Sequence, residues 1–303
     1  MGKRVITAAL ACAVALLTGA CGSTANNAGG SSGSTCPNGG TVRMGVEPFD
    51  DSALMLPVYQ QITNMIGDKL GCKVELDITT NYTSEVEAMR AKRLEVGEFG
   101  PLGYIFAHKL AGAQPVATFG DKNKTPLTYT ASIVTWKGSG VNTLKDVQGK
   151  TFAYSDPAST SGHLYPAYGL KKAGINPDNG IQAVYAGSHT ASFEAIRNHK
   201  VQAGELNSDT ITSATATGEY NAGDYITLWK SNPIPQDPIA VRGDLPTAFR
   251  DKFKSVLMGL DLSTIPDPKG VLVGPRLVAT TDHSYQGVRD LVGTLNININ
   301  QIG

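Results

Sequence analysis

The stretch DPASTSGHL, residues 156–164, decides how the rest of the chain is interpreted. A short apolar run at 151–154 precedes it and is typical of the end of a strand. Residues 164–172 can form a helix if Pro166 lies in the first turn. A strand, a tight polar turn and a helix leave backbone N–H groups free at the helix start, where the helix dipole favours an anion.

Three hydroxyl groups, from Ser159, Thr160 and Ser161, add hydrogen-bond donors at this turn, and the stretch contains no Lys or Arg. Neutral donors suit the reversible capture of a small oxyanion. An ordinary Ser/Thr helix cap is the simpler interpretation of an isolated S-T-S sequence. The rest of the chain favours the anion site.

The N-terminus has the composition of an export signal over residues 1–20. Lys3 and Arg4 precede a small, apolar run that is too short to span a membrane. Cys21 follows small residues, which resembles a bacterial lipoprotein signal, and by that resemblance Cys21 carries the lipid. A plain signal peptide with an unmodified cysteine is the alternative. The Ser-, Gly- and Asn-rich residues that follow predict a flexible tether over 21–40, which would hold the exported domain at the outer face of the cell membrane.

The remaining residues, 41–303, are enough for one large or two medium domains. The whole chain has 26 basic and 26 acidic residues. Without residues 1–20, which hold two of the basic residues, the count is 24 against 26, a net charge of −2. This balance does not indicate a nucleic-acid partner. The five histidines have no paired metal-ligand spacing, so we expect no metal and no cofactor.

Two cysteines, Cys36 and Cys72, lie outside the signal and the lipid site. Disulfides persist in exported proteins. Each cysteine directly precedes one of the first two predicted strands, and neighbouring parallel strands would place these two ends side by side. We therefore expect a Cys36–Cys72 disulfide, worth about 4 kcal/mol on the chain-entropy model.

Strand and helix patterns alternate along the chain. Strands are expected at 41–46, 73–78, 96–99, 115–119, 129–136, 151–154, 183–185, 203–206, 225–230 and 239–241, and helices at 53–70, 82–93, 101–110, 164–172, 191–197, 209–215, 246–260 and 285–295. This alternation predicts an α/β fold with mostly parallel sheets and helices on both faces. Ligands of such sheets bind at the carboxyl ends of strands. Tyr82, the 159–161 turn, His189 and Asp209 each follow a predicted strand.

Several short motifs occur in an order that is specific as a set. They are VRMGV at 42–46, NY at 81–82 with VEAMR at 86–90, FGPL at 99–102, DPASTSG at 156–162, AGSH at 186–189, NSD at 207–209 and WKSNPIPQDPI at 229–239. Together they resemble the phosphonate/phosphite-type substrate-binding proteins of bacterial ABC importers, which have the type 2 periplasmic binding protein fold. The chain departs from the family at His163, where an aromatic or apolar residue is usual, and at 94–99, which replaces a more apolar strand carrying an Asp.

The resemblance implies two lobes, each a mostly parallel sheet flanked by helices, joined by two crossing strands and closing on a ligand. Lobe one would contain residues 41–130 and 236–303, and lobe two residues 131–235. In the family, ligand oxygens meet the Ser-Thr-Ser turn, and a histidine, two tyrosines and two acidic residues also belong to the site. The corresponding positions here are Tyr82, Tyr129, Ser159, Thr160, Ser161, His189, Asp209 and Asp237.

The two acidic positions, Asp209 and Asp237, suit a ligand that carries its own proton or amine. Hydrogen phosphate has a P–OH group that a carboxylate can accept, whereas sulfate would meet unpaired negative charge. An aminophosphonate would instead pair its ammonium group with the same carboxylates, and both interpretations stay open. A turn role for Asp237 and a core role for Tyr82 and Tyr129 are the structural alternatives.

The expected function is that of a lipid-anchored receptor that delivers phosphate, phosphite or a small phosphonate to an ABC permease and its ATPase. The bulky side chains of Tyr82, Tyr129 and Phe99 favour an inorganic ion. No catalytic residue is expected, because Ser161 and His189 have no convincing third member. A hydrolase or transferase acting on phosphate esters and a surface lipoprotein that binds a partner protein are the alternatives. A monomer is the simplest expectation.

Overall fold

The computed structural model describes residues 36–300, which belong to one compact unit. The predicted signal peptide, the lipidation site Cys21 and residues 21–35 of the predicted tether lie outside the described residues. The strands are β1 Thr41–Val46, β2 Lys73–Ile78, β3 Val96–Glu98, β4 Gln114–Gly120, β5 Thr128–Tyr129, β6 Ala131–Trp136, β7 Thr151–Tyr154, β8 Gln182–Tyr185, β9 Ala203–Asn207, β10 Tyr225–Lys230, β11 Ile234–Pro235, β12 Pro238–Val241 and β13 Arg276–Val278.

The α-helices alternate with these strands. They are α1 Ser52–Leu70, α2 Tyr82–Arg90, α3 Pro101–Ala111, α4 Tyr165–Lys172, α5 His189–Arg197, α6 Ser208–Ala216, α7 Thr247–Met258 and α8 Gln286–Leu295. Asp51 caps α1 by accepting from the Ala53 amide at 2.8 Å. α2 ends at Arg90, three residues before the predicted end, and Lys92 just beyond it has a left-handed backbone (φ 59°).

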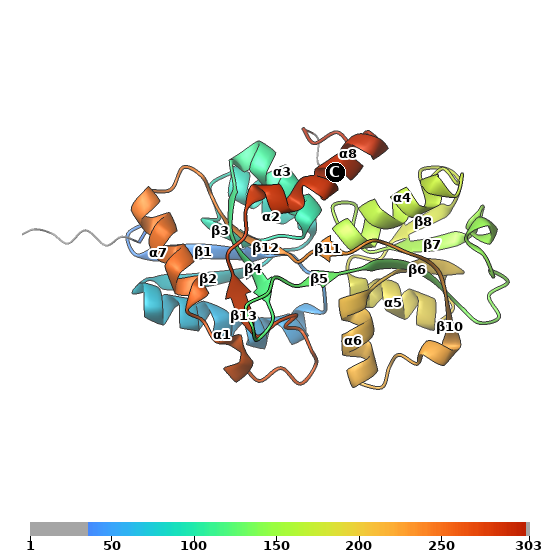
Figure 1. The fold of residues 1–303 in the computed structure, drawn as a ribbon, viewed down its shortest axis with the longest axis horizontal. Helices are drawn as coiled ribbons and strands as arrows, with labels where there is room; N and C mark the ends of the chain where they lie inside the picture. The colour runs from blue at the N-terminus through green and yellow to red at the C-terminus, as the bar shows by residue number, and fades with distance from the viewer. Residues whose placement is uncertain (1–35, 301–303) are drawn as a thin grey trace, which may run out of the picture. The chain divides into compact units, whose positions relative to one another are not determined.

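Two sheets form two lobes, which are the two halves of the ribbon in Figure 1. The first lobe carries a six-stranded sheet with the order β13-β4-β12-β3-β1-β2. The second carries a five-stranded sheet with the order β10-β6-β9-β7-β8. β5 and β11 pair antiparallel with each other and lie between the two sheets, so the chain crosses there in both directions (Figure 1).

The α/β, two-lobed prediction is confirmed, but the sheets are mixed and not mostly parallel. β1 pairs parallel with β2 and β3, and β7 pairs parallel with β8 and β9. β12 and β6 run antiparallel to their neighbours in these sheets. These two strands follow directly on the crossing segments, so each begins at the edge where the parallel strands end. Their direction is therefore set by the crossover and not by a strand–helix repeat.

Helices cover both faces of each sheet (Figure 1). α1 and α7 share one hydrophobic cluster with the first sheet, and α2, α3 and α8 form a second cluster on its other side. In the second lobe, α4 packs on one face and α5 and α6 on the other. The burial of both faces agrees with the mainly apolar sequences of the central strands β4, β6 and β12.

The predicted disulfide between Cys36 and Cys72 is present, with 5.8 Å between the Cα atoms. The two cysteines precede β1 and β2, and Thr41 pairs with Lys73 at the start of the ladder. The bond therefore closes the amino-terminal end of these two strands.

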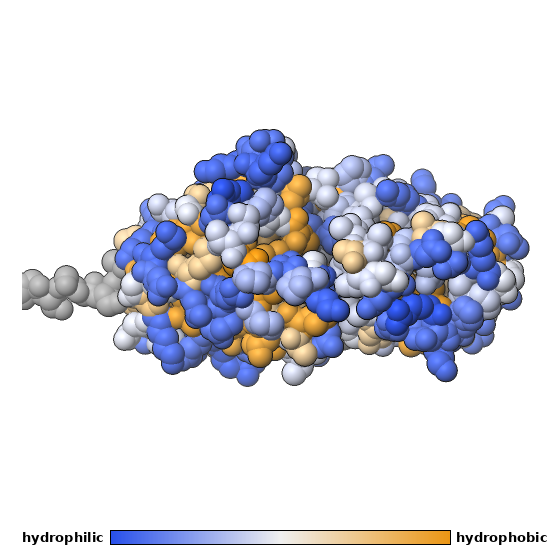
Figure 2. All heavy atoms as spheres, turned by 90° about the horizontal axis from the view of Figure 1, so that it is seen from below, coloured by the Kyte–Doolittle hydropathy of each residue, from blue (hydrophilic) through white to orange (hydrophobic). Residues whose placement is uncertain are grey.

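The surface seen from below is mainly hydrophilic, and its apolar areas gather on the half that carries the six-stranded sheet (Figure 2). Within residues 36–300, no helix has both the length and the apolar character that a membrane crossing requires.

Candidate functional site

A cavity of about 50 Å³ lies where the two lobes meet. In the same measure a single water needs roughly 10–15 Å³, so the cavity has room for a small molecule only. Its lining residues come from both lobes and from the crossing segments: Glu47, Phe49, Asp50, Tyr59, Glu98, Gly100, Phe119, Tyr129, Ser159, Thr160, Ser161, His189, Asn207, Asp209, Thr210, Ser213, Gln236, Asp237, Gly270, Val271 and Val273. None of these lining residues is Lys or Arg.

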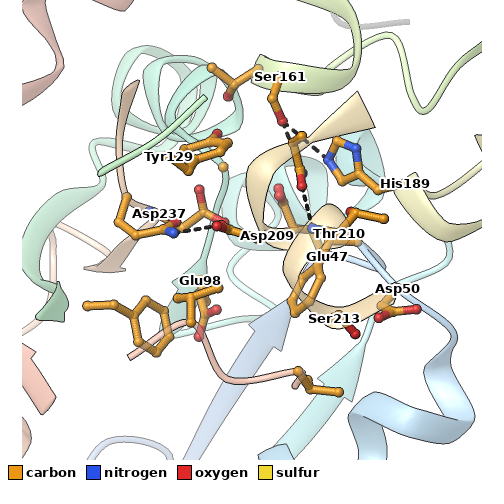
Figure 3. Close-up of a pocket in the computed structure, with 18 of the residues that line it drawn as sticks. Glu47, Asp50, Glu98, Tyr129, Ser161, His189, Asp209, Thr210, Ser213 and Asp237 are labelled. Atoms are coloured by element: carbon orange, nitrogen blue, oxygen red, sulfur yellow. Dashed lines mark hydrogen bonds between the residues drawn. The ribbon is translucent and has the colours of Figure 1, made fainter. Parts of the chain in front are cut away.

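Seven of the eight predicted ligand residues line this cavity. They are Tyr129, Ser159, Thr160, Ser161, His189, Asp209 and Asp237, and Figure 3 labels five of them around the same space. Tyr82 is not among the lining residues. Its side chain is 1% exposed, and no hydrogen-bond partner for its hydroxyl lies within the described part of the chain. Tyr82 is the first residue of α2, which follows the edge strand β2. A ligand contact for Tyr82 stays a prediction.

The hydroxyl turn after β7 is folded as an anion cradle. The Ser159 amide donates to the Asp156 carbonyl at 2.9 Å, and the Ser159 hydroxyl accepts from the Gly162 amide at 3.1 Å. The amides of Thr160 and Ser161 have no acceptor among residues 36–300. A single π-helical turn, Thr160–Leu164, then leads into α4, so the helical path begins four residues earlier than the sequence predicted. Two unpaired amides at this helical start can receive an oxyanion.

Direct hydrogen bonds join the lobes beside this turn. The Leu102 amide, at the start of α3 in the first lobe, donates to the Thr160 hydroxyl of the second lobe at 2.8 Å. The His189 amide donates to the Phe49 carbonyl at 3.1 Å. Gly100 permits this close approach, because a Cβ there would lie 3.3 Å from the Thr160 hydroxyl and 2.8 Å from Glu47 Oε1. The structure is therefore a closed arrangement in which the lobes touch around the cavity.

His189 is the only lining residue that can become a cation. Its Nε2 lies 3.5 Å from both the Ser159 and the Ser161 hydroxyls. Its Nδ1 lies 3.0 Å from each carboxylate oxygen of Glu205, which is fully buried. Burial lowers the pKa of His189, but the negative charge of Glu205 and the hydrogen bond to it raise the pKa, which ends above its ordinary value. A protonated His189 would present a positive charge to an anion held by the serine hydroxyls.

Both predicted acidic residues line the cavity, with different partners. Asp209, in the first turn of α6, accepts from the Gln236 side-chain amide at 2.8 Å. Asp237 Oδ1 is buried and has no hydrogen-bond partner within the described residues. Burial is the main cause that raises the pKa of Asp209, and burial together with the charge of Glu98 raises the pKa of Asp237 well above its usual value. Both carboxyl groups can therefore hold a proton or seek a positive partner.

Sequence reasoning missed three acidic residues that line the cavity, namely Glu47, Asp50 and Glu98. Glu47 follows β1 and Glu98 ends β3, and each is 3% exposed. β1 and β3 are neighbouring central strands of the first sheet. The rule that ligands bind at the carboxyl ends of strands points to both residues once the sheet order is known. Glu98 lies inside the 94–99 stretch that departs from the family pattern.

Between residues 36 and 300, no group of three or more His, Cys, Asp or Glu side chains could hold a metal ion.

The lobes, the crossing strands and the donor-lined cavity define a binding protein that closes on a small ligand. The description "ABC transporter, phosphonate, periplasmic substrate-binding protein" belongs to the family model that matches residues 44–290. The chain belongs to this family, whose members are extracytoplasmic binding components of transporters and not enzymes.

Individual relatives agree with this assignment. The chain is 28% identical over 313 residues to the phosphate-import protein PhnD of Mycolicibacterium smegmatis. This alignment covers 94% of each chain. It is 27% identical over 236 residues to the phosphonates-binding periplasmic protein of Escherichia coli, covering 76% of this chain and 69% of the relative. Among solved structures, PhnD1 from Prochlorococcus marinus in complex with methylphosphonate has a TM-score of 0.74 at 22% identity, covering 84% of this chain and 98% of the other. That likeness supports the shared fold.

Proposed function

We propose that this protein captures a phosphorus oxyanion, namely phosphate, phosphite or a small phosphonate, and delivers it to an ABC permease and its ATPase. The observation that carries the proposal is the pair of unpaired amides at Thr160 and Ser161, which face a closed cavity together with three hydroxyls and His189. These donors match a tetrahedral oxyanion, and affinity comes from their fixed arrangement before the ligand arrives. The names of the M. smegmatis and E. coli relatives, which refer to phosphate and phosphonates, support this ligand class.

The proposed ligand residues are those that the sequence indicated: Tyr82, Tyr129, Ser159, Thr160, Ser161, His189, Asp209 and Asp237. Calorimetric titration with phosphate, phosphite, methylphosphonate, 2-aminoethylphosphonate and sulfate tests the proposal. We expect tight binding of at least one phosphorus compound and none of sulfate. Absence of heat with all the phosphorus compounds would contradict the proposed function.

The contribution of the hydroxyl turn can be measured with one variant and one control. Ser161→Ala removes a hydroxyl that would donate to a charged oxygen, and such bonds contribute about 1.5–3 kcal/mol, which is a loss of roughly 10- to 150-fold in affinity. Ser255→Ala is the matched control, because Ser255 is exposed on α7 and does not line the cavity. If the Ser161 variant binds as tightly as the control variant, the hydroxyl turn is not part of the binding site.

The lobe boundaries and the membrane anchor belong to the same proposal. We place lobe one at 41–130 and 236–303 and lobe two at 131–235, because the first sheet takes its strands from the outer segments and the second sheet from the middle one. Lipid attachment at Cys21 would hold the protein on the outer face of the cell membrane as a monomer. Replacing Cys21 by Ser should release the protein into the medium, as measured by fractionation; continued membrane association would contradict the anchor.

A further inference from the structure

The start of helix α8 is fixed to the first lobe. A short helical turn, Asp282–Tyr285, leads into α8, and the Tyr104 hydroxyl of α3 donates to Asp282 at 2.5 Å. The fully buried Tyr285 donates its hydroxyl proton to the Gln236 carbonyl at 3.1 Å. Gln236 follows β11 directly, so α8 begins beside the segment that crosses between the lobes.

The rest of α8 contacts the second lobe. It touches α4 and the turn Thr160–Leu164, and Figure 1 shows it between the helices of the first lobe and α4. Leu164 and Tyr165 of the second lobe share one hydrophobic cluster with Val288 and Val292 of α8, and all four are at most 8% exposed. Within residues 36–300, the other two clusters of the second lobe contain second-lobe residues only. The cluster around α8 therefore continues from one lobe into the other.

A lysine of the second lobe binds the far end of α8. Lys171 lies in the last turn of α4, and its Nζ donates to the Thr294 carbonyl at 2.9 Å. This carbonyl belongs to the last turn of α8, where carbonyl groups have no partner within the helix and the helix dipole is negative. A lysine cation at this position satisfies a carbonyl and favours the dipole at once.

These contacts belong to the closed arrangement of the lobes. Leu164 ends the same π-helical turn that presents Thr160 and Ser161 to the cavity, so α8 contacts this turn from outside the cavity. Rotation of the second lobe about β5 and β11 would move the turn and α4 relative to α8, which is fixed to the first lobe. Opening would therefore disturb the apolar contact and the Lys171 hydrogen bond together.

We propose that α8 is a strap that stabilises the closed lobes from outside, and that Lys171 is a positioning residue for ligand capture through this strap. The inference rests on the proposed function, because it concerns the closure that retains the ligand. The strap is a third connection between the lobes, in addition to β5 and β11. Neither Lys171 nor any residue of α8 lines the cavity, so the effect on affinity comes from closure alone.

Charge reversal at Lys171 tests the strap, and the next residue supplies a matched control. Lys171→Glu would place a negative charge at the negative end of α8 and should weaken binding of phosphate and methylphosphonate by about 3- to 30-fold in calorimetry. Lys172→Glu makes the same change of net charge in the same turn of α4. Lys172 is also exposed, and its Nζ lies over the Tyr168 ring of its own helix. We expect the Lys172 variant to bind like the wild type.

Two further measurements separate positioning from a structural role. Lys171→Arg keeps the cation and should restore binding to within about twofold of the wild type. The unfolding midpoint of the ligand-free protein should be the same for Lys171→Glu and Lys172→Glu, because both remove one cation from the end of α4.

The outcomes distinguish this inference from the proposed function. If Lys171→Glu and Lys172→Glu weaken binding equally, the loss is a general effect of charge on the anion, and the strap is refuted while the oxyanion receptor stands. If Lys171→Glu lowers the unfolding midpoint without weakening binding more than Lys172→Glu does, Lys171 has a structural role only and the strap is again refuted. If the wild-type protein binds none of the phosphorus compounds, the proposed function itself fails.

Discussion

The hydrogen bond between the Leu102 amide and the Thr160 hydroxyl allows a sharp test of lobe closure. The donor belongs to the first turn of α3 in one lobe, and the acceptor belongs to the hydroxyl turn of the other. Thr160→Val keeps the shape of the side chain and removes the acceptor. In the closed arrangement the Leu102 amide would then be buried without a partner, since Leu102 and Thr160 are at most 1% exposed. In an open arrangement the same amide can hydrogen-bond to water.

The expected loss of affinity follows from this difference between the closed and the open arrangement. An unsatisfied buried amide costs about 1–3 kcal/mol, and this cost falls on the closed state alone. Ligand binding requires closure, so the cost is subtracted from the binding free energy. We expect this closure cost alone to raise the dissociation constant of the proposed phosphorus ligand by about 5- to 150-fold, because each 1.4 kcal/mol corresponds to a factor of ten. Loss of the Thr160 hydroxyl as a proposed ligand donor would add to this rise.

Calorimetric titration of the wild-type, Thr160→Val and Thr160→Ser proteins measures this effect. The serine variant keeps the hydroxyl and should bind within a few-fold of the wild type, which controls for the lost methyl group. Small-angle scattering without ligand should show a more open average shape for the valine variant than for the serine variant. If the valine variant binds with wild-type affinity, closure does not depend on this hydrogen bond and the reasoning is refuted.

Two further predictions concern stability and pH. Replacing Cys36 and Cys72 by Ser should lower the free energy of unfolding by about 4 kcal/mol, measured by guanidinium denaturation; an unchanged unfolding midpoint would contradict the stabilising role. Ligand affinity should change little, because the disulfide lies at the opposite end of β1 and β2 from the cavity. The pKa of His189 is raised, so its positive charge is complete below the ordinary value of about 6.5 and is lost as the pH rises through the raised value. Affinity for methylphosphonate should fall over that range, and Glu205→Gln should move the fall to lower pH; the same pH profile in both proteins would show that Glu205 does not hold the charge on His189.

Much of the fold was predictable because its local signals agree with its packing. The alternation of strand and helix patterns placed most of the elements to within a few residues, but the short strands β11 and β13 were not predicted. The direction of β6 and β12 was not predictable from periodicity, because it depends on where the chain re-enters each lobe. A short strand after a crossover has the same sequence pattern whichever way it runs.

The site was predictable where a polar residue follows a strand or matches a family motif. Ser159, His189 and Asp209 were found in this way, and all three line the cavity. Glu47 was missed because a charged residue directly after a strand is usually solvated, and only the sheet order shows that β1 is a central strand. Val271 lies in an irregular segment with no periodicity, so its place beside the cavity depends on tertiary packing alone.

The Cys36–Cys72 disulfide, just before β1, also fixes the point at which the preceding residues join the folded domain. β1 runs from Thr41 to Val46 and reaches the cavity at Glu47, a path of about 20 Å at the usual rise per residue. Any pull on the segment before Cys36 is therefore transmitted to a cross-linked corner shared with Cys72. If the chain is anchored through Cys21 as proposed, tension from the anchor would act on this corner and not on the crossing strands β5 and β11 between the lobes.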